Sequence, residues 1–251
     1  MRLLVSVVSA QEARRALAGG ADIVDVKDPR EGALGAPSPR VLSEVVRTVG
    51  TAAPVSVALG DVPVLPNTAA LARVAYVKVG LRTVATLDDA VAMVSQVADA
   101  VGPHTAVIAA TYAEARALDP PAFSPAWLPA LVERTGIAGA LVDTFVKDGR
   151  GLYGWSSEAE LTELVARTRA AGGTFGVAGQ LRLGELRRVA ADVVGVRSAV
   201  CRDGDRNSEL DADLVAAAVA EVRQSGMIRV PTPPTARTTT VTPVRRTASG
   251  M

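Results

Sequence analysis

The amino-acid sequence predicts a single (β/α)₈ barrel of the TIM type. Short apolar runs rich in β-branched residues recur along the chain, and segments with helical spacing separate them. The runs are continuous rather than alternating, which is typical of parallel strands buried on both faces. With 251 residues, 49% of them hydrophobic, the chain can bury the core of one such barrel. No GxGxxG motif follows the first predicted strand, which disfavours a doubly wound open sheet.

The predicted secondary structure alternates strand and helix. Ser9 and Glu12 have the spacing of a capping box, and the glycine pair at 19 and 20 is expected to end that helix. Ser157 and Glu160 repeat the capping-box spacing ahead of another helix. The predicted strands cover residues 3–6, 23–27, 55–58, 76–79, 106–110, 140–143, 174–178 and 193–196. The remaining predicted helices cover residues 39–49, 68–73, 87–101, 128–135, 183–191 and 211–224.

The C-terminal segment differs in composition from the rest of the chain. From residue 226 onward the sequence is rich in proline, threonine and arginine and has no hydrophobic periodicity. Such a segment cannot bury enough apolar surface to fold, which predicts disorder. We therefore assign residues 1–225 to one catalytic barrel domain and residues 226–251 to a disordered tail.

Composition and charge exclude several classes of function. A formal net charge of +1 and only eight aromatic residues argue against binding to nucleic acid or to an anionic membrane. No apolar stretch approaches the length of a membrane span, and no signal-peptide pattern is present. The single cysteine, Cys201, fits a reducing compartment, so we expect a cytoplasmic protein. His104, the single histidine, precedes a strand at the wrong end of the barrel, and no zinc site is expected.

The distribution of lysine is the most informative feature of the sequence. Only three of the 27 basic residues are lysine, namely Lys27, Lys78 and Lys147. All three lie at or just after the C-terminal ends of predicted strands two, four and six, the end at which barrel active sites form. An ε-amine can lose its proton and add to a carbonyl as an imine, whereas a guanidinium cannot. Scattered surface cations would instead be expected on the helices.

Two carboxylates accompany these lysines. Asp25 and Lys27 are two residues apart on one strand, so their side chains point to the same face. Asp143 ends the sixth predicted strand, and Lys147 follows in the loop. The carboxylates can move protons during catalysis, and structural ion pairs are the alternative interpretation.

A phosphate site is expected in the loops after strands seven and eight, where many barrels bind phosphate. Glycines allow close approach of backbone N–H groups to an anion, and hydroxyl and guanidinium groups add donors. The candidates are Gly179, Gly195, Arg197, Ser198 and Arg206. For a second phosphate the candidates are Arg150, Gly151 and the loop at 32–35.

Five segments of the chain together resemble one enzyme family, the (5-formylfuran-3-yl)methyl phosphate synthases, also called 4-(hydroxymethyl)-2-furancarboxaldehyde-phosphate synthases. The resemblance spans residues 3–222 and rests on GGADIVDVKDPREGALGAPSP, VSVALGDVP, YVKVGL, LVDTFVKDG and DVVGVRSAVCRDGDRN. It implies a TIM barrel that condenses two molecules of glyceraldehyde 3-phosphate into a phosphorylated furan aldehyde. One phosphate and two waters are lost, and the product feeds methanofuran-like or secondary-metabolite furan biosynthesis.

The same resemblance implies roles for individual residues. It places the Schiff-base lysine at Lys27 and the proton-transferring lysine at Lys78, and it matches Asp25, Asp143 and Lys147 to other active-site positions. This is lyase chemistry without a metal or an organic cofactor, so we expect none. A homo-oligomer is compatible with the sequence, which does not give the oligomeric state.

Two other functions fit the same residues. Another class I aldolase would share the lysines, the carboxylates and the phosphate site but would release no inorganic phosphate. A non-catalytic barrel that binds a sugar phosphate would form no imine, and it would have no need of lysine in place of arginine.

Overall fold

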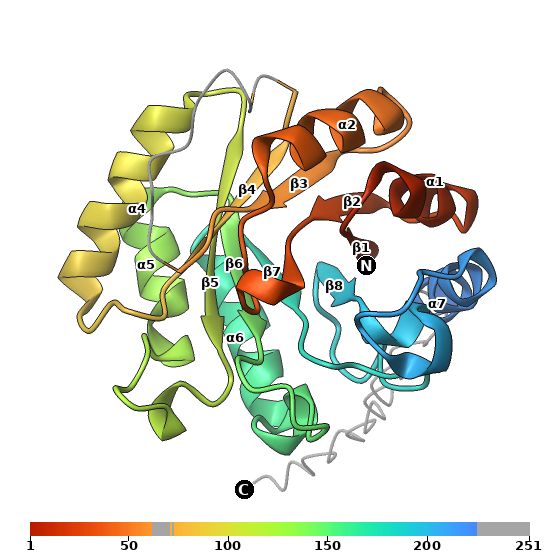
Figure 1. Cartoon of the computed structure of the whole chain (residues 1–251). Helices are drawn as coiled ribbons and strands as arrows, with labels where there is room; N and C mark the ends of the chain where they lie inside the picture. Colours follow the sequence, from red (N-terminus) through yellow and green to blue (C-terminus); the bar gives the residue numbers. More distant parts are fainter. Residues whose placement is uncertain (62–70, 72, 225–251) are drawn as a thin grey trace, which may run out of the picture.

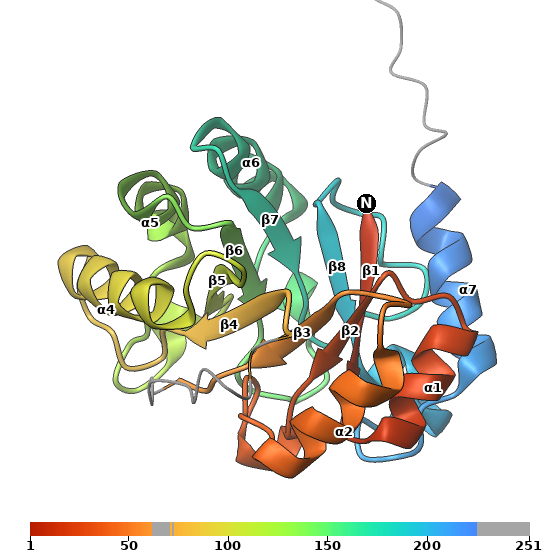
Figure 2. The same ribbon diagram turned by 90° about the horizontal axis from the view of Figure 1, so that it is seen from above.

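The chain folds into a closed barrel of parallel strands surrounded by helices (Figure 1), as the sequence predicts. The computed structural model describes residues 1–61, 71 and 73–224. Within them, eight strands pair in chain order, and β1 pairs with β8 to close the sheet. Seen from above, α4, α5 and α6 flank one side of the barrel and α1, α2 and α7 flank the other (Figure 2). Among the described residues, no helix has the length and apolar character that crossing a membrane requires.

The strands lie within about two residues of their predicted bounds. They are β1 (Arg2–Val7), β2 (Ile23–Val26), β3 (Val55–Ala58), β4 (Tyr76–Gly80), β5 (Ala106–Tyr112), β6 (Gly139–Asp143), β7 (Thr174–Val177) and β8 (Val193–Val196). The α-helices are α1 (Ala10–Ala18), α2 (Pro39–Val49), α4 (Leu87–Val101), α5 (Leu128–Thr135), α6 (Glu158–Ala170) and α7 (Ala212–Gln224). Short 3₁₀ helices are η1 (Pro29–Glu31), η2 (Ala115–Ala117), η3 (Pro125–Trp127), η4 (Leu152–Gly154), η5 (Ser198–Val200) and η6 (Arg202–Gly204).

Successive side chains of each strand point alternately to the apolar layer under the helices and to the interior of the barrel. On β4, Val77 and Val79 belong to the apolar cluster between strands and helices, whereas Lys78 lies between them in sequence and lines a pocket inside the barrel. On β6, Val142 belongs to that cluster and Asp143 lines the same pocket. Because successive side chains of a strand point to opposite faces, a charged residue between valines is directed inward.

The two predicted capping boxes differ in the structure. The box at the start of α6 is complete, with Ser157 and Glu160 each accepting a backbone N–H from the other. At the start of α1 the Ser9 hydroxyl accepts the backbone N–H of Glu12, but the Glu12 carboxylate binds Val8 N–H and Arg197 instead. The second half of that capping box is therefore absent because the carboxylate is used in a tertiary contact.

The predicted helix at 183–191 is wrong. The segment forms consecutive turns, because Gly184 has φ +93°, which a right-handed helix cannot contain. Glu221 of α7 accepts the backbone N–H groups of Gly184 and Leu186, which stabilises the turns. The predicted helix at 68–73 and the predicted disordered tail at 226–251 fall largely or wholly outside the described residues.

Candidate active site

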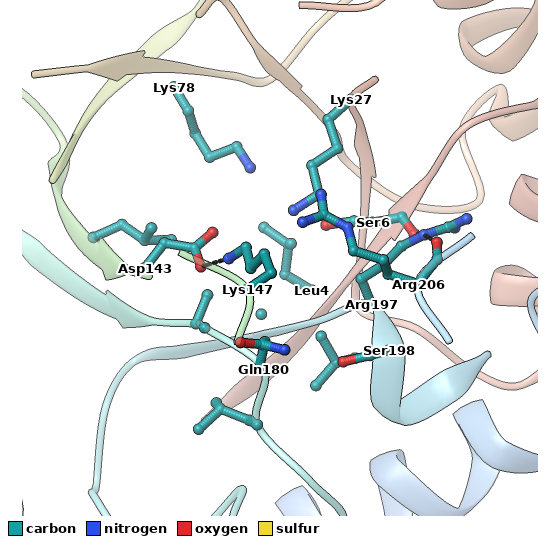
Figure 3. Close-up of a pocket in the computed structure, with 16 residues that line it drawn as sticks. Leu4, Ser6, Lys27, Lys78, Asp143, Lys147, Gln180, Arg197, Ser198 and Arg206 are labelled. Carbon is teal, nitrogen blue, oxygen red and sulfur yellow. Dashed lines mark hydrogen bonds and ion pairs between the residues drawn. The ribbon is translucent and has the colours of Figure 1, made fainter. Parts of the chain in front are cut away.

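The inward-pointing charged side chains of β2, β4 and β6 meet at the C-terminal mouth of the barrel. Figure 3 shows Lys27 and Lys78 with their ammonium ends directed into one space, opposite Lys147 and Asp143. These four residues line a single pocket together with the predicted phosphate ligands Gly179, Gly195, Arg197, Ser198 and Arg206. Asp25, the remaining predicted site residue, lies next to this pocket and contacts Lys78. The structure thus brings together all ten predicted residues, although they come from five different strands or their loops.

Asp25 and Lys78 form a fully buried ion pair. The Lys78 ammonium donates to Asp25 Oδ2 over 2.7 Å, and the two side chains are 5% and 0% exposed. Ser6 on the adjacent strand β1 donates its hydroxyl to the same oxygen over 2.9 Å. Asp25 Oδ1 has no hydrogen-bond partner among the described residues. One carboxylate oxygen therefore accepts two hydrogen bonds, and the other accepts none from the described residues.

Lys27 differs from the other two lysines because no carboxylate contacts it. Its ammonium makes one long hydrogen bond, 3.4 Å, to the carbonyl of Ala33, and no ion pair of Lys27 is found among the described residues. Burial lowers the pKa of Lys27 to about 8, with the neighbouring charges of Lys78 and Lys147 acting in the same direction and Asp143 opposing them. Lys27 therefore becomes a neutral amine more readily than an ordinary lysine does.

Asp143 and Lys147 form the second ion pair of the site. Lys147 lies in the turn after β6 and donates to Asp143 Oδ1 over 2.9 Å and to the Thr144 hydroxyl over 3.0 Å. Burial would raise the pKa of Asp143, but the ammonium groups of Lys147 and Lys27 and the Thr144 N–H outweigh it, and the pKa falls to about 2. The carboxylate stays ionised in any physiological medium.

Arg206 is the clearest anion ligand on the β7–β8 side of the pocket. Its Nη2 is buried without a hydrogen-bond partner, and no carboxylate pairs with it among the described residues. Burial lowers the pKa of this guanidinium, a sign of incomplete compensation of its charge. Gly179 has φ +114°, and a Cβ there would lie 2.8 Å from the Thr144 side chain, so the loop requires glycine at this position.

Arg197 has a different role from Arg206. Its guanidinium forms a buried ion pair with Glu12 of α1 and donates to the carbonyls of Ser6 and Arg206. These contacts occupy most of its donors, and the Glu12 charge neutralises it. Arg197 lines the pocket, and its contacts hold β1, α1 and the loop of Arg206 in fixed positions relative to one another.

The candidates for a second phosphate do not line the pocket around Lys27. Arg150 pairs with Asp148 over 2.6 Å and stacks on Trp155. Gly151 has φ +67°, and a Cβ there would lie 3.2 Å from the carbonyl oxygen of Gln180. In the loop at 32–35, the Ala33 carbonyl contacts Lys27. A separate hollow of about 390 Å³ reaches Lys27 from the side of η1 and α2, and its lining includes Asp28, Arg30, Ser38, Arg197 and Asn207.

Several residues of the site were not singled out in the sequence analysis. Ser6 could have been recognised as a polar residue inside an apolar strand, and Gln180 follows a glycine in the phosphate loop. No local signal marks the contact in which Tyr112, at the end of β5, donates its hydroxyl to Asp61 over 2.6 Å. Burial raises the pKa of both groups. This pair lies beside the apolar cluster of Leu34 and Leu141 at the barrel mouth.

The remaining residues discussed from sequence lie apart from the pocket. His104 is exposed in the turn before β5, and Cys201 is buried, which raises the pKa of its thiol. Among the described residues, no group of three or more His, Cys, Asp or Glu side chains is placed to hold a metal ion.

The balance of charge in the pocket favours an anionic substrate. Three lysines and Arg206 face two carboxylates, since Arg197 is neutralised by Glu12. A buried amine of lowered pKa beside fixed ammonium and carboxylate groups can form an imine and move protons around it. Such an arrangement suits a phosphorylated carbonyl compound.

Comparison with known proteins identifies the family of this chain. Residues 3–219 match the profile of a family described as 4-HFC-P synthase. The chain belongs to the 4-HFC-P synthase family. Relatives named (5-formylfuran-3-yl)methyl phosphate synthase include a Methanosarcina mazei protein, 38% identical over 88% of this chain and 99% of its own length. A Methanopyrus kandleri protein of that name is 40% identical over 82% of this chain and 92% of its own length.

Solved structures show the fold of this 4-HFC-P synthase family member rather than its activity. Phosphoribosyl anthranilate isomerase from Thermus thermophilus superposes with a TM-score of 0.60 at 16% identity, over 89% of this chain and 99% of that one. The isomerase from Thermotoga maritima gives 0.62 at 13% identity, over 89% and 98%. These likenesses support the TIM-barrel assignment alone.

Proposed function

We propose that this protein condenses two molecules of glyceraldehyde 3-phosphate into (5-formylfuran-3-yl)methyl phosphate through an imine on Lys27. The observation that carries the proposal is the contrast among the three lysines. Lys78 and Lys147 each hold a carboxylate, whereas Lys27 is buried among positive charges with no ion-pair partner among the described residues. Membership of a family whose named relatives are this synthase supports the choice of product, and glyceraldehyde 3-phosphate is the substrate that the sequence resemblance implies.

The protonation state of Lys27 supports its role as nucleophile. With a pKa of about 8, roughly a tenth of the amine is neutral at pH 7, whereas well under a hundredth of an ordinary lysine is. The neutral amine adds to the carbonyl carbon of one triose phosphate, and loss of water gives the imine. The charges of Lys78 and Lys147 add to burial in favouring the neutral amine of Lys27.

The two ion pairs supply the proton transfers that follow. Lys78 and its partner Asp25 can move protons between imine and enamine. Lys147, held by Asp143, lines the same pocket as Lys27 and can protonate a leaving group. A second triose phosphate then eliminates its phosphate and becomes an enol, which attacks the captured triose. Cyclisation, release of the Lys27 amine and loss of a second water then yield the aromatic furan.

Two compartments beside Lys27 fit a reaction that joins two substrates. The pocket with Arg206, Ser198 and Gly179 suits one phosphate, and the hollow beside η1 and α2 suits the second triose. Lys27 is the lysine that lines both. The predicted roles of Arg150 and Gly151 as second-phosphate ligands remain proposals with less support, since neither lines a hollow that reaches Lys27. We propose that the product serves furan biosynthesis in the cytoplasm.

The first experiment incubates the purified protein with glyceraldehyde 3-phosphate alone. We expect a six-carbon furan aldehyde monophosphate by mass spectrometry, with one inorganic phosphate released per product. An intact six-carbon bisphosphate would identify an aldolase instead. Unchanged substrate would contradict any condensation and leave a barrel that only binds sugar phosphates.

The second experiment locates the imine. Borohydride reduction in the presence of substrate is expected to add one triose phosphate to the peptide that contains Lys27. Lys27→Arg keeps the charge but cannot form the imine, so we expect no adduct and a loss of turnover on the order of a thousandfold or more. An adduct on Lys78 or Lys147 in the wild-type protein, with Lys27→Arg still active, would refute this assignment.

A further inference from the structure

A second cavity lies outside the pocket around Lys27, between the segment that carries η2 and η3 and the N-terminal part of α6. Its volume is about 340 Å³, within the range of small-molecule sites in proteins. The charged residues of its lining are Glu114, Arg116, Glu160, Glu163 and Arg167, and Trp155 also lines it. None of these residues lines the pocket that contains the three lysines.

Two buried polar atoms in the lining of this cavity lack a partner. Glu114 is 2% exposed, and its Oε2 accepts no hydrogen bond from the described residues. The indole Nε1 of Trp155 is likewise buried and donates to nothing among them. Arg150 stacks on the ring of Trp155, 3.9 Å from its centroid, and so occupies the ring face rather than the N–H. An unsatisfied acceptor and an unsatisfied donor thus line the same cavity.

The other oxygen of Glu114 connects this cavity with the active site. Glu114 Oε1 accepts the backbone N–H groups of Phe145 and Val146, each over 2.7 Å. The next residue along the chain is Lys147, whose ammonium holds Asp143. One buried carboxylate therefore fixes the turn that presents a catalytic lysine and also faces the second cavity.

The charge of Glu114 indicates what the cavity binds. No cation forms an ion pair with this carboxylate among the described residues, and an uncompensated buried charge is costly. A ligand ammonium would supply both the counter-charge and the missing donor to Oε2. The indole N–H requires an acceptor, and Arg116, which forms no ion pair among the described residues, lies in the same lining to attract a negative group. Arg167 is already paired with Glu163 over 3.6 Å. The complementary molecule carries an ammonium and a carboxylate on a small skeleton.

We propose that this cavity is a binding site for a free α-amino acid, with the ammonium on Glu114 and the carboxylate on Trp155 Nε1 and Arg116. Occupancy changes the hydrogen bonding of Glu114 and thereby the turn at Phe145 and Val146. The bound amino acid consequently alters the placement of Lys147. The binding site itself does not depend on the proposed synthase activity, whereas its effect on catalysis does.

The test measures binding directly, in the absence of triose phosphate. Each of the common α-amino acids is screened singly for a concentration-dependent rise in Tm, and those that raise it are titrated by calorimetry. For each, the N-acetyl derivative and the matching α-hydroxy acid serve as controls because they lack the ammonium. We expect at least one amino acid to bind and its two controls to fail. Binding by none of them, or equal binding by the controls, would overturn the proposal and leave a water-filled cavity.

Two variants and a matched control locate the site. Trp155→Phe keeps the ring but removes the N–H, and is expected to weaken binding about fivefold. Glu114→Gln keeps the acceptor for Phe145 and Val146 but removes the charge, and is expected to weaken it about tenfold or more. Trp127→Phe changes the other tryptophan, which lies in η3 against Phe123, and should leave binding unchanged. Unaltered affinity in both Trp155→Phe and Glu114→Gln would show that the amino acid binds elsewhere.

Discussion

The two lysine–carboxylate pairs of the site are built in different ways. Lys78 and Asp25 are separated by 53 residues and meet only because β2 and β4 face one another inside the closed barrel. Lys147 and Asp143 are four residues apart, and one turn after β6 brings them together. The first pair is almost completely buried, with 5% and 0% exposed, whereas the Lys147 side chain is 18% exposed.

This difference separates a rigid half of the site from an adjustable half. Residues of two strands that both pair with β3 fix the Asp25–Lys78 pair, so its geometry follows from the fold itself. The Asp143–Lys147 pair depends on the conformation of one turn, which Glu114 holds by two hydrogen bonds. We therefore expect changes at the first pair to affect stability most, and changes at the second pair to affect mainly the proton chemistry of Lys27.

The largest effect is expected from Asp25→Asn. The substitution leaves the Lys78 ammonium buried without a counter-charge, which costs about 3–5 kcal/mol of unfolding free energy. Asp143→Asn should cost less, because the partly exposed Lys147 can turn toward solvent. Urea denaturation of both variants measures the comparison. Equal losses would show that the two pairs are energetically alike.

A double variant separates the stability of the first pair from its chemistry. Asp25→Asn combined with Lys78→Met removes both charges, so most of the stability lost in Asp25→Asn should return. Turnover should not return, because the proton-transferring groups are gone. A double variant that recovered turnover would exclude both residues from the reaction.

The second pair is expected to tune the pKa of Lys27 in two directions. Asp143 raises that pKa, so Asp143→Asn should lower it below about 8 and move the acid limb of kcat/KM to lower pH. Lys147 lowers the pKa of Lys27, so Lys147→Met should move the acid limb to higher pH. Shifts of about one pH unit are expected from a single charge at this range.

In these pH profiles the informative result is the direction in which the acid limb of kcat/KM moves, not the decrease in kcat. Both variants lose activity if Lys147 moves protons, so a drop in kcat alone does not distinguish them. Opposite displacements of the acid limb are expected only if the neutral amine of Lys27 is the reacting form. Identical displacements in both variants would contradict that assignment.

The same contrast explains what could be predicted from sequence. The three lysines stand out against an arginine-rich background, and the i,i+4 spacing of Asp143 and Lys147 is local, so both features were visible. The partner of Asp25 was not, because strand spacing places Lys27 beside it in sequence while its hydrogen-bond partner is Lys78 on another strand. The Glu12–Arg197 pair joins residues 185 apart and depends on closure of the barrel between β8 and β1.

Tertiary contacts also explain the error in secondary structure. The pattern at 183–191 has helical spacing, and Leu186 and Val189 are buried as a helix would bury them. The positive φ of Gly184 and the carboxylate of Glu221, which lies 37 residues further along the chain, stabilise turns there instead. Neither effect can be read from the hydrophobic pattern.

The smallest predicted effect concerns the serines on either side of Asp25. Ser6 of β1 and Ser56 of β3 are the register partners of Asp25, and both are buried. Ser6 donates to Asp25 Oδ2, whereas the hydroxyl of Ser56 has no partner among the described residues.

Ser6→Ala should therefore cost about 1 kcal/mol of unfolding free energy and reduce kcat severalfold, because the carboxylate that holds Lys78 loses one of its two donors. Ser56→Ala removes no hydrogen bond from Asp25 and serves as the matched control, with a smaller cost and unchanged kcat. If the two variants behaved alike in denaturation and turnover, the Ser6 hydroxyl would contribute nothing to the orientation of Asp25, and the rigidity of this pair would come from the strands alone.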